Sequence, residues 1–225
     1  MLSEAIGSLL VSAAAVALSP IPIIAIVVVL GTPKARTAGP AFALGWVVGI
    51  AVVATASVLL LADADDPNSS TATGINWVDV GVGVLFLGMA AKQWGKRPEP
   101  GQAPETPGWM ARLDSLSAGR AVGLGLVLSA LNPKNLALTF TAAASIAAAG
   151  LSDADTAIAI AVFVIVGSIT VAGAVVVYLI DAERAARPLE AVKGFMSDHN
   201  AVIMMVILLL LGLKLLGNGL GGLWA

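Results

Sequence analysis

Cysteine is absent from the 225 residues of this chain, and histidine occurs once, at His199. The chain therefore has no disulfide framework and no thiol for redox chemistry, and a metal site built from cysteine or from several histidines is excluded. Charged residues make up 12% of the sequence and the formal net charge is -2, so the basic excess that binds a nucleic-acid backbone is missing. We expect no metal, no cofactor and no nucleic-acid partner.

Hydrophobic residues are unusually abundant in this chain. They make up 58% of the sequence, and the mean hydropathy is +0.95, whereas a soluble domain is roughly 45–50% apolar and 25% charged. Six apolar runs cover residues 5–30, 40–62, 75–94, 121–149, 156–179 and 201–216. Each is close to or above the roughly 20 residues that a helix needs to cross a bilayer, and the alternating segments of a transmembrane β-barrel are absent. The sequence predicts an all-α integral membrane protein with six transmembrane helices.

Lysine and arginine are concentrated in alternate connections. Ten of the twelve lie in or beside the connections that follow the first, third and fifth runs, whereas the other two connections carry aspartate and neither Lys nor Arg. Positively charged loops stay in the cytoplasm, so we expect a multi-pass plasma-membrane protein with both termini outside. The first run is expected to be a retained helix rather than a secretory signal, because no Lys or Arg precedes it.

This orientation gives the two halves of the chain opposite topologies, as in transporters built from inverted repeats. We expect one three-helix repeat over residues 1–95, a cytoplasmic linker over residues 96–119, and a second repeat over residues 120–225. Within the linker, "GWMARLDSL" is either a plain tether or a short interfacial helix. The glycines of "GVGVLFLG" indicate close helix packing rather than nucleotide binding.

Prolines interrupt the first and fourth runs at matching places. A shift of 113 residues lays Ser19-Pro20 over Asn132-Pro133. Proline inside a helix removes a hydrogen bond and frees carbonyl groups, and paired breaks of this kind indicate a transporter's binding site. A packing kink is the alternative at each single proline. The candidate substrate-binding residues are Ser19, Pro20, Pro22, Ser129, Asn132, Pro133, Lys134, Asn135 and Asp79.

Lys134 lies in the middle of an apolar run. A charge near the bilayer centre costs roughly 2.5–3.5 kcal/mol, so this lysine needs a counter-ion or a cavity. Three interpretations remain open: an ion pair with Asp79, contact with the anionic headgroup of a substrate, or extension to the outer interface. The sequence pattern does not bring a serine, a histidine and an acidic residue together as a hydrolase site would require. We therefore expect no catalytic residues and no enzyme.

The segments "LSPIPIIAIVVVLGTPKARTAGPAFALGWVVG" and "LSALNPKNLAL" resemble the Gap/Sap family, glycolipid- and sulfolipid-addressing proteins of the lysine-exporter (LysE) superfamily. The resemblance covers nearly the whole chain and implies export of an envelope glycolipid or another amphiphile. It carries over Ser19, Pro20 and Pro22 from the first motif and Asn132, Pro133, Lys134 and Asn135 from the second, without naming their ligand contacts.

Two other functions compete with lipid export. A small-molecule or amino-acid exporter would need a compact site for ammonium and carboxylate together. An accessory subunit would support a larger lipid exporter, and faces rich in small residues, such as "TAAASIAAAG", could pack against its helices or form a homo-oligomer.

Overall fold

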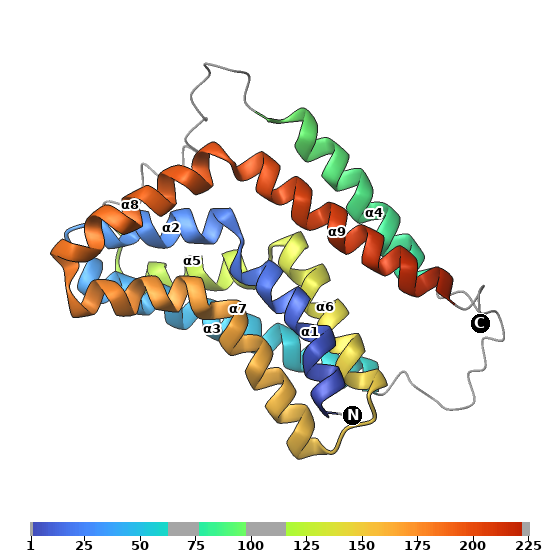
Figure 1. The fold of residues 1–225 in the computed structure, drawn as a ribbon. Coiled ribbons are helices and arrows are strands. Elements are labelled where there is room, and N and C mark those ends of the chain that lie inside the picture. Colours follow the sequence, from blue (N-terminus) through green and yellow to red (C-terminus); the bar gives the residue numbers. More distant parts are fainter. Residues whose placement is uncertain (1, 63–76, 98–115, 222–225) are drawn as a thin grey trace. The chain divides into compact units, whose positions relative to one another are not determined.

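Helices make up nearly all of the described structure. The structure is a computed structural model that describes residues 2–62, 77–97 and 116–221. Within these ranges the helices are α1 (Leu2–Ala17), α2 (Pro20–Leu30), α3 (Ala35–Ala62), α4 (Trp77–Gly95), α5 (Ala118–Ala130), α6 (Pro133–Ala148), α7 (Asp153–Ile180), α8 (Ala182–Asp198) and α9 (Asn200–Leu220) (Figure 1). The predicted all-α class is confirmed. The linker segment that could form an interfacial helix lies, apart from its last residue, outside the described ranges.

Two of the predicted helices are broken where their prolines stand. The axis turns by 50° between α1 and α2, and by 62° between α5 and α6. Pro20 is the first residue of α2 and Pro133 is the first residue of α6. Proline suits the first turn because its missing N–H would have no helical acceptor there, and its fixed backbone angle fits a helix start. The two predicted breaks are confirmed.

Five of the six predicted spans have candidates in the structure. The helices α3, α7 and α9 are each long and apolar enough to cross a membrane, and each broken pair adds one candidate. The remaining run corresponds to α4, which carries Asp79 and Lys92 and is not among the candidates. These helices are those of a multi-pass membrane protein. A sixth span, the inverted repeats and the location of the termini remain predictions.

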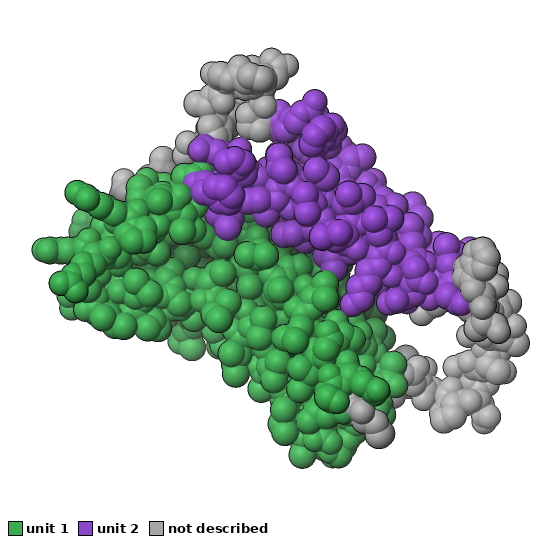
Figure 2. All heavy atoms as spheres, in the orientation of Figure 1, with its two compact units in different colours: residues 1–65, 105–194 green, residues 66–104, 195–225 purple. Residues whose placement is uncertain are grey.

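The chain forms two compact units (Figure 2). The first contains residues 1–65 and 105–194, and the second contains residues 66–104 and 195–225. In the first unit, α3 packs along α5, α6 and α7, and α1 packs against α6 and α7. In the second unit, α4 and α9 pack against each other. The two predicted three-helix repeats describe an internal symmetry, and the division into these units does not test it. The repeats therefore remain a prediction.

Glycines bring α3 and α5 into backbone contact in the first unit. A β-carbon added at Gly45 would overlap the Val122 carbonyl, and one added at Gly125 would overlap the Phe42 carbonyl. Nearby, Trp46 is 1% exposed and packs in the same core. This contact fixes the first half of the broken helix α5–α6 against the 28-residue helix α3.

A second glycine contact joins α4 to α9. A β-carbon at Gly83 would lie 3.0 Å from the Gly212 carbonyl oxygen, and one at Gly212 would lie 3.0 Å from that of Gly83. Gly81, in contrast, has nothing within 4 Å of an added β-carbon. The close packing predicted for "GVGVLFLG" is therefore confirmed at Gly83.

The connection between the last two predicted spans is itself a helix. α8 follows α7 after the single residue Asp181 and precedes α9 after the single residue His199. The sequence pattern indicates only a basic connection between two spans here, and the structure shows that this connection is helical. Apolar side chains at helical spacing, from Leu189 to Met196, are the signal for the helix.

Candidate functional site

The break between α1 and α2 leaves backbone carbonyls of α1 without helical partners. The N–H of Ser19 donates to the Val16 carbonyl at 3.1 Å instead of the Ala15 carbonyl, and Pro20 has no N–H to donate. Side chains from other helices take over. The Thr170 hydroxyl of α7 donates to the Ala17 carbonyl at 2.6 Å. Buried carbonyl groups are costly when unpaired, so these side-chain bonds are what makes the break stable.

Lys134 supplies the second of these bonds. Its Nζ donates to the Ala15 carbonyl at 2.9 Å and to the Ser19 hydroxyl. The residue is 2% exposed and stands in the first turn of α6, a helix that lies along α1 (Figure 1). The ammonium therefore sits at the carbonyl end of α1, where the helix dipole favours a positive charge.

Asn135 connects the two breaks. Its amide Nδ2 donates to the Leu128 carbonyl near the end of α5 at 3.2 Å. The Ser19 hydroxyl lies 3.1 Å from the Asn135 Oδ1 and 2.7 Å from the Val16 carbonyl, and its single proton can be donated to one of them at a time. We call Ser19, Lys134 and Asn135 the break cluster. All three are buried.

Asn132 and Ser129, which were also predicted as site residues, lie outside the break cluster. The Asn132 Oδ1 accepts from the Lys134 N–H at 3.0 Å and so caps α6. Ser129 donates to the Leu126 carbonyl at 3.1 Å and faces α3, where it fills the space beside Gly49. It is therefore not a member of the break cluster.

The prolines and Asp79 complete the predicted set. Pro20 and Pro22 are buried in the first turn of α2, and Pro133 is exposed at the start of α6. Asp79 belongs to α4, in the second unit, so the ion pair between Asp79 and Lys134 remains a prediction.

Polar side chains outside the two proline motifs also lie in this part of the first unit, and the sequence motifs do not indicate them. Besides Thr170, the indole N–H of Trp46 in α3 donates to the Gly167 carbonyl of α7 at 3.4 Å. The hydroxyl groups of Ser12 in α1 and Ser168 in α7 are buried and have no hydrogen-bond partner in the described part of the chain. A hydroxyl inside an apolar run was the available signal for Thr170 and Ser168, but their neighbours depend on tertiary packing.

The chemistry of this arrangement favours an anion. Lysine has three N–H donors, and two of those of Lys134 are used. Within the first unit its acceptors are a backbone carbonyl and a hydroxyl, and no carboxylate among the described residues of that unit contacts it. The site therefore contains a buried amine whose hydrogen-bond acceptors in the first unit are neutral groups. A negatively charged ligand would complete it.

A family model described as "Sap, sulfolipid-1-addressing protein" matches residues 9–221, which include both breaks and the whole break cluster. Comparison with curated proteins gives no match, and comparison with solved structures gives none.

Proposed function

We propose that this chain, which belongs to the Sap, sulfolipid-1-addressing protein, family, exports a lipid-like or amphiphilic substrate of the envelope-glycolipid class across the cytoplasmic membrane. The break cluster holds the anionic headgroup of this substrate. The observation that carries the proposal is the buried ammonium of Lys134, which two neutral acceptors solvate. Membership of the wider lysine-exporter superfamily is part of the same proposal.

The energetics of the buried charge support headgroup binding. A cation in a low-dielectric interior loses its hydration, and a carbonyl and a hydroxyl restore only part of that free energy. A sulfate or phosphate group would add the opposite charge where Coulomb interactions are strong. The Ser19 hydroxyl is the acceptor that such an oxygen would replace, since it has two other neighbours at 2.7 and 3.1 Å.

Apolar side chains beside both breaks support an amphiphilic substrate over a small polar one. Leu18 is 46% exposed and Ile21 is 40% exposed at the first break, and Leu131 is 68% exposed at the second. Acyl chains can lie against such side chains while the headgroup reaches Lys134. A compact amino-acid site would instead be enclosed by polar groups for both its ammonium and its carboxylate.

Transport into reconstituted liposomes tests this function. The purified protein is compared with two charge-deleting variants, Lys134→Met and the control Lys34→Met, whose lysine is exposed in the connection between α2 and α3. The substrates are a sulfated glycolipid and its desulfated form. We expect the wild type and Lys34→Met to move the sulfated lipid, and Lys134→Met to lose at least about tenfold in rate, equivalent to about 1.4 kcal/mol.

Three results would contradict the proposal. They are equal rates for Lys134→Met and the wild type, transport of amino acids without transport of lipid, and activity that requires a larger exporter. A Lys134→Met protein that unfolds and that Asp79→Asn restores would indicate a structural ion pair instead, because coupled partners are not additive.

A further inference from the structure

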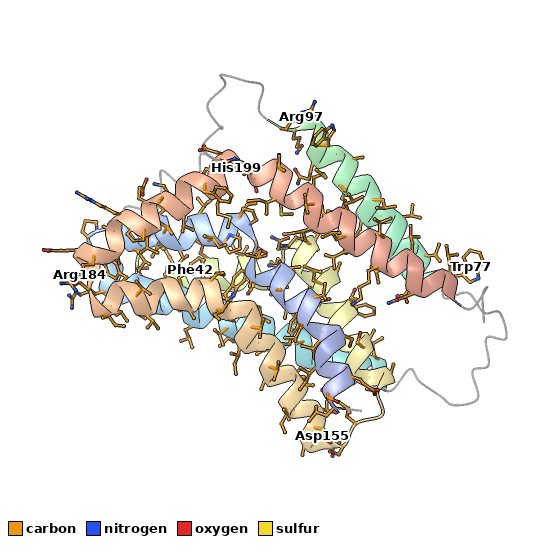
Figure 3. The ribbon with its side chains drawn as sticks, in the orientation of Figure 1. Phe42, Trp77, Arg97, Asp155, Arg184 and His199 are labelled. Carbon is orange, nitrogen blue, oxygen red and sulfur yellow. The ribbon has the colours of Figure 1, made fainter. Side chains whose placement is uncertain are left out.

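The helix α8 connects two candidate membrane spans through single residues. α7 runs to Ile180 and α9 begins at Asn200, and one residue separates α8 from each. Arg184 and His199 mark the two ends of α8 in Figure 3. Consecutive spans cross a membrane in opposite directions, so two spans at α7 and α9 would end and begin at one membrane surface. With that topology, the chain connectivity ties both ends of α8 to the same surface.

α8 is also too polar to enter the bilayer core. Its 17 residues include six charged ones, which are Glu183, Arg184, Arg187, Glu190, Lys193 and Asp198. At 1.5 Å per residue the helix is about 25 Å long, which at this composition is compatible with lying along a surface.

The two flanks of α8 differ in chemistry. Glu183, Arg187 and Glu190 follow one another at spacings of four and three residues, which places them on one flank. Leu189, Val192 and Phe195 follow at spacings of three residues on another flank. Val192 is 43% exposed and Phe195 is 55% exposed, so much of this apolar flank is uncovered.

The charges of α8 balance. Three basic and three acidic side chains give no net charge. Two pairs are formed locally: Lys193 Nζ lies 2.6 Å from Glu190 Oε1, and Arg184 Nε lies 3.2 Å from Asp181 Oδ2. A helix of this kind has no surplus of positive charge with which to bind anionic headgroups, so its apolar flank must supply the attraction to lipid.

We propose that α8 is an in-plane membrane helix that inserts Val192 and Phe195 among the lipids and keeps Glu183 and Arg187 in water. The partner is the lipid surface itself, because both ends of α8 are tied to that surface by single residues. Since the helix is neutral, the insertion does not depend on anionic lipid. This inference is independent of the proposed transport function.

Spin labelling tests the inference directly, because the chain has no native cysteine to remove. Single cysteines replace Val192 and Phe195, and the matched controls replace Glu183 and Arg187 on the charged flank. Each labelled protein is reconstituted in phosphatidylcholine vesicles and in vesicles that also contain phosphatidylglycerol. Power saturation then compares the collision of each label with oxygen, which partitions into lipid, and with a water-soluble nickel chelate.

We expect the labels at Val192 and Phe195 to collide mainly with oxygen and the control labels mainly with nickel, with the same pattern in both vesicles. Four labels that all prefer nickel would overturn the inference. Immobilised labels at Val192 and Phe195 that neither reagent reaches would also overturn it and would indicate a protein partner. If the Glu183→Cys control is not recovered in the membrane, the labels at Val192 and Phe195 are compared with the label at Arg187. If the Arg187→Cys control is not recovered, they are compared with the label at Glu183.

Discussion

The backbone contact between α3 and α5 predicts that replacing Gly125 by alanine destabilises the protein. An alanine at this position places its β-carbon over the Phe42 carbonyl and 2.8 Å from the Trp46 N. Both neighbours are backbone atoms, so no side-chain rotation relieves the overlap and the two helices must separate. Forcing extra volume into a packed contact costs about 1–3 kcal/mol. Alanine also gains up to about 1 kcal/mol over glycine in helix propensity, which offsets part of that cost.

Gly123→Ala is the matched control. Gly123 lies two residues earlier in α5, and an added β-carbon there has nothing within 4 Å. Both variants gain the same propensity, so the difference between their free energies of unfolding isolates the overlap, about 1–3 kcal/mol. Unfolding is followed by circular dichroism in detergent micelles with increasing denaturant. Equal stability of the two variants would refute the close backbone contact.

Other predictions concern the second glycine contact, the break and the topology. Gly83→Ala should weaken the α4–α9 pair and Gly81→Ala should not, because a β-carbon at the former meets the Gly212 carbonyl; equal melting temperatures would contradict this. Pro133→Ala should give a folded, membrane-inserted protein with little export, since the restored N–H lets α6 continue α5; full activity would make the break a packing kink. A cysteine at Ser152 should react with an impermeant thiol reagent on whole cells, and one at Gln102 should not. Labelling at Gln102 alone would reverse the orientation.

Local rules predicted the parts of the fold that depend on single residues. The excess of apolar residues predicted helices, because every backbone group in lipid must be paired within its own segment. Pro20 and Pro133 indicated the breaks because a missing N–H removes a hydrogen bond from its own helix. Pro40 lies inside α3 without interrupting it, so a proline alone does not require a break. Asn132 and Lys134 were expected near the second break, and their cap and buried amine are found there.

The partners of Lys134 were beyond prediction from the pattern. An inventory of charged residues offers Asp79 as a partner, and that ion pair stays a prediction. The acceptors that the structure shows are the Ala15 carbonyl and the Ser19 hydroxyl, which such an inventory does not contain. A carbonyl becomes available only because another helix is broken, and which broken helix lies next to Lys134 is decided by tertiary packing. The same holds for Thr170, whose acceptor is the Ala17 carbonyl.

The account's central claim is that the headgroup of an anionic lipid binds at the break cluster through Lys134. Its most direct test is an electron cryomicroscopy structure of the protein in nanodiscs that contain the sulfated glycolipid. We expect headgroup density within hydrogen-bond distance of the Lys134 Nζ and acyl density along Leu18 and Leu131. A lipid bound elsewhere with the Lys134 Nζ still on the Ala15 carbonyl and the Ser19 hydroxyl, or a small enclosed polar ligand at the break, would contradict the claim.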